Sequence, residues 1–541
     1  MEVKLNKLFE RLIKIRGLTE DFLNPKYENL EDPFILPDME KAVECLKTAI
    51  KTDEKILIYG DYDVDGVTAS TVMESALKLA GVKPENLEIM LPDRFLDGYG
   101  MSPKLIERAK KQGITLVITV DCGSHNHEII DELNELKIDT IVTDHHEVGE
   151  TLPEAIAVIN PKRRDSKSEN LRNLAGVGVA FKFAEALAKE GMIENGQEKW
   201  LLDLVLIGTI CDNMLLIGEN HILGFYGLKV LAKTRRPGLR ELMQSAGVKN
   251  LNSESIGFQI GPRLNAAGRL DTAELSLNLL RTDSAPEAAS LTNKLEALNK
   301  KRKTEQISAT NEIEKRGIID GPVVIEVGNW HEGILGIVAG KLVERYQKPA
   351  FVLTEVENGY LKGSGRSFGD FNLAEALSNV KDLIISGGGH AAAAGVRLEQ
   401  KNLYAFREKI NAYYESLNLK NQEKYLKPTP DLDIEDLSEL NLDFLEELKK
   451  LEPFGLGNEE PIFRLKNVNI ELIRKMGADE KHLRLDIKDK KGRIMKLVAF
   501  YAPENWLNLD YEDKIEPIIK LTENDFNGVK SVEGRIIDIV I

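Results

Sequence analysis

The chain has 541 residues, a hydrophobic content of 42% and a formal net charge of −16. That length predicts about three or four domains, and the charge argues against a protein that coats nucleic acid nonspecifically, although a locally basic cleft is compatible with it. No apolar run reaches the ~20 residues that cross a bilayer. The three cysteines, Cys45, Cys122 and Cys211, have no paired spacing, which is typical of a cytoplasmic protein.

Three aspartates, Asp61, Asp63 and Asp65, alternate along the chain directly after the apolar run Ile56–Tyr59. The run predicts a buried parallel strand, and ligands of open α/β sheets bind just beyond the carboxyl ends of such strands. Acids packed there repel one another, so a divalent cation is expected between them. An EF-hand is excluded because its twelfth position, Val72, is not Glu. A solvated acidic turn is the remaining alternative for this motif alone.

Two more apolar runs follow, Leu116–Val120 and Thr140–Thr143, and helix-like stretches cover Ser102–Gln112 and His127–Lys137. This alternation of strand and helix predicts right-handed crossovers and a parallel sheet. All strands of such a sheet end at one edge. Acids that are far apart in the sequence are therefore expected to converge there.

The second run ends in Asp121, and the third ends in Asp144, His145 and His146. A histidine pair is more often structural, but these two follow an acid at a third strand end. Imidazole beside carboxylates favours manganese, iron or zinc over calcium.

A further acid, Asp212, follows the segment Trp200–Cys211, which is nearly all apolar and predicts a buried helix. A buried charge is costly without a partner. The partner is either an arginine or a metal ion, and the other acids favour the metal.

Composition changes along the chain divide it into segments 1–235, 236–318, 319–418 and 432–541, with a charged linker at 420–431. The first is α/β, and the second contains one long helix, Ala285–Arg316, as a rod between domains. Its cluster Lys300–Lys303 is interpreted as a solvated face. The third is a smaller α/β block. The last has short strand-like runs that predict a small β-barrel, namely His482–Lys488, Ile494–Tyr501 and Gly534–Ile541.

The smaller α/β block has polar chemistry of its own. Leu361–Ser367 combines a hydroxyl, a guanidinium and glycines, which suits phosphate binding. Ser386–His390 is interpreted as a Gly-rich turn, either approaching a ligand closely or starting a helix. Together the two segments indicate a polyanionic substrate.

These residues resemble the DHH phosphoesterase superfamily and, within it, the RecJ family of single-strand-specific exonucleases. Four segments resemble the shared superfamily motifs: 60–66, 120–123, 144–146 and 208–212. Segments 176–181, 264–269 and 330–333 resemble RecJ in particular. The two polar segments of the smaller block resemble the DHHA1 domain, and the tail from Pro453 resembles an OB-fold. The resemblance covers nearly the whole chain and names its segments as a DHH catalytic domain, a connecting region, a DHHA1 domain and an OB-like domain.

The resemblance implies roles for individual residues. It implies metal ligands at Asp63, Asp65, Asp121, His145 and Asp212, and a catalytic set that adds Asp61 and His146, with Asp144 close by. It implies substrate binding by Arg94, Arg269, Ser364, Arg366 and His390. Ser124 and the segment Asn213–Leu216 depart from the family pattern but leave the implied ligands intact.

The implied activity is hydrolysis of single-stranded DNA from 5′ to 3′ in repair and recombination, by a mechanism with two Mn²⁺ or Mg²⁺ ions. Implied partners are single-stranded DNA, a single-strand-binding protein and a RecQ-type helicase, with no membrane. One alternative is a DHH-family nanoRNase or cyclic-dinucleotide phosphodiesterase, but those enzymes are generally shorter and the OB-like tail favours a longer strand. A second alternative is an inactive replisome scaffold, which would have lost motif acids that are all present here.

Overall fold

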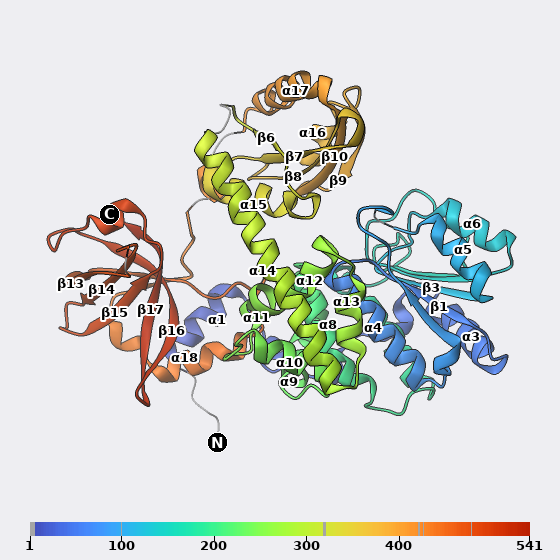
Figure 1. Ribbon diagram of the computed structural model, residues 1–541. Helices are drawn as coiled ribbons and strands as arrows, with labels where there is room; N and C mark the ends of the chain where they lie inside the picture. Colours follow the sequence, from blue (N-terminus) through green and yellow to red (C-terminus); the bar gives the residue numbers. More distant parts are fainter. Residues whose placement is uncertain (1–5, 99, 318–320, 420–421, 426, 478) are drawn as a thin grey trace. The chain divides into compact units, whose positions relative to one another are not determined.

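The computed structural model describes residues 6–98, 100–317, 321–419, 422–425, 427–477 and 479–541. These form two compact units (Figure 1): one contains Glu31–Met214 and Gly227–Gln422, and the other contains Leu215–Tyr226, Glu423–Ile541 and the residues before Glu31. The predicted domain boundary at 318–319, and Lys420, Asn421 and Leu426 of the predicted linker, lie outside the described residues. Within the described ranges, no helix combines the length and apolarity needed to cross a bilayer.

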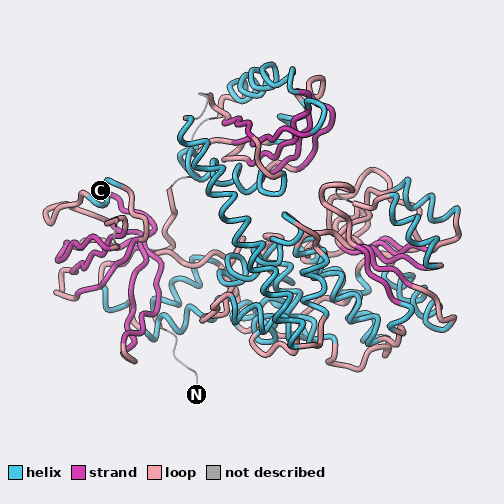
Figure 2. The backbone as a smooth tube through the Cα atoms, viewed as in Figure 1, coloured by secondary structure: helices cyan, strands magenta, loops and turns pink. Residues whose placement is uncertain are grey.

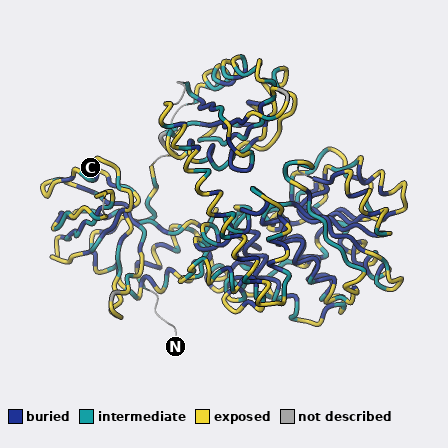
Figure 3. The backbone as a smooth tube through the Cα atoms, viewed as in Figure 1, coloured by how far each residue is buried: buried dark blue, intermediate teal, exposed yellow. Residues whose placement is uncertain are grey.

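The first sheet is fully parallel, with strand order β2-β1-β3-β4-β5. Helices α5 and α6 pack on one face, in one apolar cluster with Leu57, Tyr59 and Val117, while α3 and α4 lie on the other side (Figure 1). Every residue of β1 and β3 is buried as a result (Figure 3). The bounds are β1 Ile56–Tyr59, β2 Leu87–Met90, β3 Leu116–Val120, β4 Asp139–Thr143, β5 Ala157–Ile159, α3 Met39–Lys51, α4 Val64–Leu79, α5 Pro103–Gln112 and α6 His127–Glu135.

The predicted parallel α/β sheet is therefore confirmed, and two of its strands match the predicted bounds residue for residue. Their β-branched and leucine side chains suit a strand covered on both faces.

A helical layer packs against α4. Its first members are α7 and α8, and the predicted buried helix before Asp212 is α8, entered through a 3-10 turn at Glu198–Leu201. The region 239–282 is largely helical. The bounds are α7 Gly176–Lys189, α8 Leu202–Cys211, α9 Gly218–Leu231, α10 Pro237–Ser245, α11 Ser253–Ser255, a π-helical turn Ile256–Ile260, α12 Gly261–Leu270 and α13 Glu274–Arg281.

The predicted long helix is confirmed as α14, Ala285–Arg316. Ser284 caps its start by accepting a hydrogen bond from the backbone N of Glu287 at 3.4 Å, and Gly317 follows its end. The interpretation of Lys300–Lys303 as wholly solvated is wrong for Arg302, which is only 7% exposed. Arg302 falls on the buried stripe of the helix, whereas its neighbours in the cluster face solvent.

The second sheet is mixed, with order β6-β7-β8-β10-β9. The segment Ser386–Gly389 was expected to be a turn or a helix start, and this is wrong: it belongs to the exposed edge strand β9, paired antiparallel with β10. Glycine is permissive in extended backbone as well as in turns, so composition alone misled here. The bounds are β6 Val324–Gly328, β7 Ala350–Val356, β8 Tyr360–Arg366, β9 Ile384–Gly389, β10 Ala393–Glu399, α15 Leu335–Tyr346, α16 Leu373–Ser378 and α17 Leu403–Ser416.

The other unit contains a seven-stranded sheet, drawn as strands in Figure 2, with order β11-β12-β16-β17-β15-β14-β13. Among the described residues its ladders do not close into a barrel; an isolated bridge, Val468 to Ile515, links the starts of β13 and β16. Helices α1 and α18 contribute to its core. The bounds are β11 Leu432–Ile434, β12 Phe463–Leu465, β13 Asn469–Met476, β14 His482–Lys488, β15 Ile494–Ala499, β16 Glu516–Phe526, β17 Val529–Val540, α1 Lys7–Arg16, α2 Glu20–Leu23, α18 Leu442–Leu448 and α19 Glu504–Leu507.

Candidate active site

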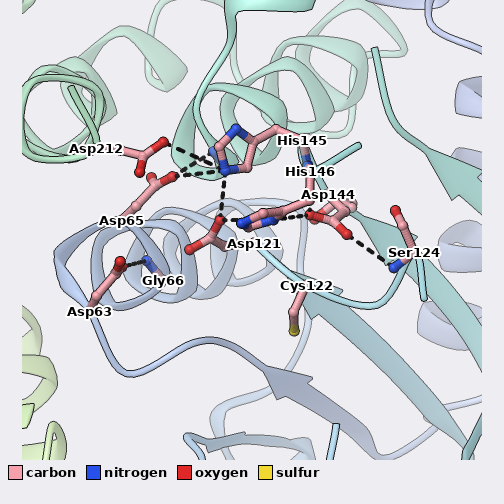
Figure 4. A network of polar contacts seen from close by, with 12 residues as sticks. Asp63, Asp65, Gly66, Asp121, Cys122, Ser124, Asp144, His145, His146 and Asp212 are labelled. Atoms are coloured by element: carbon pink, nitrogen blue, oxygen red, sulfur yellow. Dashed lines mark hydrogen bonds and ion pairs between the residues drawn. The ribbon is translucent and has the colours of Figure 1, made fainter. Parts of the chain in front are cut away.

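The carboxyl ends of β1, β3 and β4 bring acidic side chains to one edge of the first sheet (Figure 4). Asp63 is the N-cap of α4 and accepts a hydrogen bond from the backbone N of Gly66 at 3.1 Å. Asp65 follows in the first turn of the same helix. The strand, loop and helix N-terminus thus present this motif as a rigid unit facing the edge of the sheet.

Asp65 is held by a second helix. Its carboxylate accepts hydrogen bonds from the backbone N of Gly176 at 2.7 Å and of Val177 at 2.9 Å, which are the first residues of α7. The first N–H groups of a helix lack internal partners and favour a negative charge. Burial and the charge of Asp63 nevertheless raise the pKa of Asp65 to about 7. The carboxylate is well positioned but lacks a compensating positive charge.

Two glycines allow this close packing. A Cβ atom at Gly176 would lie 2.5 Å from Cβ of Asp121, and one at Gly208 would lie 2.9 Å from Oδ1 of Asp65. Any larger residue would displace a carboxylate. Both glycines stand in segments that resemble family motifs, but nothing in the sequence alone indicates that they touch the acids.

His145 lies at the centre of the cluster. Its Nε2 atom is 3.1 Å from Oδ1 of Asp121, 3.6 Å from Oδ2 of Asp212 and 3.8 Å from Oδ2 of Asp65 (Figure 4). Burial, and next the charge of His146, lower the pKa of His145 to about 3. A neutral imidazole has a nitrogen lone pair available to a metal ion. Among the described residues no arginine forms an ion pair with Asp212; its carboxylate lies beside His145 and Asp65, in a group that could hold a metal ion.

Asp144 lies next to the cluster and forms hydrogen bonds that orient it. It accepts hydrogen bonds from the backbone N atoms of Ser124, His145 and His146, and its Oδ1 lies 2.8 Å from Nδ1 of His146. Burial opposes ionisation, but these bonds and the two histidines hold the pKa of Asp144 well below its usual range. Burial likewise opposes protonation of His146, yet the bond to Asp144 leaves its pKa raised.

The departure at Ser124 fits this arrangement. Its backbone N donates to Asp144, and its buried hydroxyl accepts a hydrogen bond from Nδ2 of Asn160 at 3.0 Å. Asn160 also donates to the backbone O of His146 at 2.9 Å. Asn160 could not be recognised from the sequence, because its role depends on a contact between two loops.

The electrostatics of the cluster fit divalent cations. Burial and neighbouring acids raise the pKa of Asp61 and of Asp212 to about 8, and raise that of Asp121 well above its usual range. Oδ1 of Asp61 is buried without a hydrogen-bond partner. Unpaired buried carboxylates are unfavourable unless a cation lies between them.

Three groups of side chains have ligand atoms close enough to hold an ion: Asp61, Asp63 and Asp121 form the first, Asp65, His145 and Asp212 form the second, and Asp121, His145 and His146 form the third. Asp121 and His145, which are in contact, join the first two groups. Oxygen ligands with a single imidazole suit Mn²⁺ or Mg²⁺.

Arginines flank the acids within the same unit. The Arg94 guanidinium lies over the ring of Tyr62, 5.0 Å from the ring centre. Tyr62 stands between Asp61 and Asp63 in the sequence. Nη1 of Arg269 donates to the backbone O of Gly333 at 3.3 Å, and Nη1 of Arg366 donates to Oγ of Ser364 at 3.1 Å. Burial, then the charges of Arg94, Arg366 and Arg302, lower the pKa of Arg269 to about 9. Four of the five predicted substrate-binding residues are thus near one another.

His390 is the exception. It lies exposed in the turn between β9 and β10, where its backbone N donates to the O of Ala393 at 2.8 Å. In the described part of the chain, no hydrogen bond or ion pair joins its ring to Ser364 or Arg366.

Three family models match the chain: the DHH family N-terminal domain at residues 55–209, the DHHA1 domain at 320–416 and the RecJ OB domain at 431–538. The single-stranded-DNA-specific exonuclease RecJ of Bacillus subtilis is 35% identical over 96% of this chain and 65% of its own length. The RecJ of Escherichia coli is 33% identical over 92% of this chain and 89% of its own length.

The crystal structure of Thermus thermophilus RecJ with Mn²⁺ matches with a TM-score of 0.82 and 29% identity, over 98% of this chain and 75% of that one. The same protein with Mg²⁺ matches with a TM-score of 0.76 and 26% identity, over 98% and 74%.

Proposed function

Because this chain belongs to the RecJ family, we propose that it is a metal-dependent exonuclease that hydrolyses single-stranded DNA from its 5′ end, in DNA repair and recombination. The observation that carries the proposal is the juxtaposition, in one unit, of buried carboxylates that could hold metal ions and of Arg94, Arg269 and Arg366, which form no ion pair with an acid among the described residues. The relatives named as single-stranded-DNA-specific exonucleases support the substrate. The Mn²⁺ and Mg²⁺ complexes of the Thermus protein support the cofactor.

Asp63, Asp65, Asp121, His145 and Asp212 would hold two ions, which when bound activate water and neutralise charge on the phosphoryl oxygens. Asp61 belongs to the first group, and its buried Oδ1 has no hydrogen-bond partner in the described part of the chain. Asp144 fixes the ring of His146, whose raised pKa favours a positive charge next to Asp121. The positive charge of His146 would compensate part of the negative charge of the reacting phosphate.

Arg94, Arg269, Ser364 and Arg366 would bind the phosphates of the strand. Guanidinium groups bind phosphate oxygens through paired hydrogen bonds, and burial strengthens such contacts. His390 would act, if at all, at the exposed rim. We assign 1–235 as the DHH catalytic domain, 236–318 as the connecting region, 319–418 as DHHA1 and 432–541 as the OB-like domain. A single-strand-binding protein and a RecQ-type helicase are the proposed protein partners.

The test compares 30-mers labelled at the 5′ or the 3′ end, as single strand and as duplex, with Mn²⁺ and with EDTA. Early release of a labelled mononucleotide only from the 5′-labelled single strand, and only with Mn²⁺, is the expected result. A dinucleotide and a cyclic dinucleotide are run in parallel. Faster turnover of either short substrate would replace the proposal with a small-substrate phosphodiesterase, and no turnover of any substrate would favour an inactive scaffold.

A further inference from the structure

The buried stripe of α14 changes character halfway along the helix. Ala288, Leu291 and Leu295 are apolar, and so are Ala309 and Ile313, but the positions between them are Asn299 and Arg302. In the first half of the helix, Glu296 contacts Ser245 of α10 and Arg263 of α12, and in the second half, Ala309 and Ile313 share an apolar cluster with α15. The polar interruption therefore lies where the helical layer gives way to the second sheet domain.

The guanidinium of Arg302 is buried without an acid. Nε and Nη2 donate to Oδ1 of Asn299 at 3.2 and 3.0 Å, and Nη1 donates to Oε1 of Gln306 at 3.3 Å. Both acceptors are neutral. No carboxylate oxygen lies within 4.0 Å of Arg302 in the described part of the chain. An arginine has five N–H donors, so two remain for another group.

Two other partly buried arginines outside the candidate site, Arg163 and Arg281, are compensated by acids. Arg163 donates to Asp38 and Asp165, and Arg281 donates to Glu74. This chain has 88 acidic residues, so acids are plentiful. A guanidinium at 7% exposure without a counter-ion costs folding free energy unless an external anion compensates it.

The surroundings indicate which anion. The charge of Arg302 acts on Arg269, together with those of Arg94 and Arg366. Arg269 ends α12, where its backbone O would touch a Cβ atom placed on Gly333, in the loop before α15. Four cations from four separate segments thus lie near one another: Arg94 after β2, Arg269 in α12, Arg302 in α14 and Arg366 in β8. A single phosphodiester carries one negative charge, so a group of four cations suits several consecutive phosphates.

We propose that Arg302 is a further phosphate-binding residue, oriented by Asn299 and Gln306 to contact the backbone of the single strand next to the phosphate bound by Arg269. This inference rests on the proposed function for the identity of the polyanion. Arg302 is not recognisable from the sequence because it stands among lysines, a pattern that is typical of a solvated helix face.

The experiment measures binding of a 5′-phosphorylated dT 20-mer to the full chain in EDTA, by fluorescence anisotropy over a range of salt concentrations. Arg302→Gln should weaken binding roughly tenfold, the effect of losing a hydrogen bond to a charged group. It should also reduce the slope of log K against log salt by about 0.7, the value for one phosphate contact on a single strand. Lys303→Gln, an exposed neighbour on the same helix, is the matched control and should change neither quantity.

A second variant, Asn299→Asp, tests whether Arg302 binds phosphate even if Arg302→Gln fails to fold. It keeps the volume and the acceptor oxygen but gives Arg302 an internal counter-ion. We expect its thermal stability to be equal to or above that of the wild type, while its salt slope falls by about 0.7. Opposite changes in stability and binding are not expected of a purely structural arginine.

Wild-type affinity and salt slope in a folded Asn299→Asp protein would overturn the proposal, as would equal losses in Lys303→Gln. Because no metal is present, these readouts are independent of hydrolysis. Failure of the wild type to cleave DNA with Mn²⁺ would count against the proposed function instead.

Discussion

Oδ1 of Asp121 lies 3.1 Å from Nε2 of His145, although 24 residues separate them in the chain. Asp121 has a positive φ of 61°, a left-handed conformation that directs its backbone out of β3 immediately after the strand ends. The contact joins the first two groups of candidate ligands. The carboxylate and the neutral imidazole would both be available to hold the metal ions of the proposed function.

Replacing Asp121 with Asn should therefore abolish hydrolysis while sparing DNA binding. The change keeps the side-chain volume but removes the negative charge that would attract both ions. We expect hydrolysis with Mn²⁺ to fall by at least about a hundredfold, the upper effect known for outer-shell partners of a metal site. Affinity for the 20-mer in EDTA should stay close to that of the wild type. Asp139→Asn, an exposed acid on β4, is the control, and near-normal turnover by Asp121→Asn would refute the metal assignment.

Gly176→Ala should damage the same site by steric means. The new Cβ atom would lie 2.5 Å from Cβ of Asp121 and 2.6 Å from its Oδ1, so the carboxylate must move. Overpacking of this kind costs about 1–3 kcal/mol of unfolding free energy. We expect lower thermal stability and a strong loss of turnover. Gly178→Ala, two residues along α7, meets only the side chain of Leu174 at 3.0 Å and should have a smaller effect on both readouts.

Without metal, the protein should become less stable as the pH rises from 7 to 9. The pKa values of Asp61 and Asp212 are raised to about 8 and that of Asp65 to about 7, so the folded state binds protons that the unfolded state has already released. The stability difference grows until the pH exceeds the folded pKa values. Each kcal/mol lost lowers Tm by roughly 2–4 °C.

The measurement is thermal unfolding at pH 7 and pH 9, with EDTA and with Mn²⁺. Bound cations favour the ionised carboxylates, so the metal should reduce or reverse the pH effect. An identical pH dependence in both conditions would contradict the electrostatic account of the cluster.

Asp144→Asn should lower the pKa of His146. The Asp144 carboxylate accepts hydrogen bonds from three backbone N atoms and faces Nδ1 of His146, and its charge holds that pKa above the usual value. An amide provides neither the charge nor the second acceptor. Histidine-selective NMR titration measures the shift, with exposed His390 as an internal reference. An unchanged His146 pKa would mean that Asp144 does not control it.

The first sheet and its acidic edge could be predicted from the sequence because they depend on local patterns. Ile56–Tyr59 and Leu116–Val120 are apolar runs of strand length, and each ends directly before an acid. The alternation of strands with helices predicts a parallel sheet, and in a parallel sheet the acids that follow the strands lie at one edge. The seven-stranded sheet was similarly indicated by short alternating runs such as His482–Lys488.

Only the tertiary structure decided what each polar group faces. Helices α10, α12 and α13 pack on α14, a contact that their own sequences do not indicate. Ser386–Gly389 is an edge strand because β10 provides its hydrogen bonds. Two backbone N–H groups of α7 donate to Asp65, and Gly176 leaves space for the side chain of Asp121. Arg302 is buried without an acid beside it. Each of these features depends on elements that are distant in the sequence. A sequence pattern shows which side chains of one helix or strand face the core. Which charged groups lie close enough to compensate one another depends on how the helices and strands pack together.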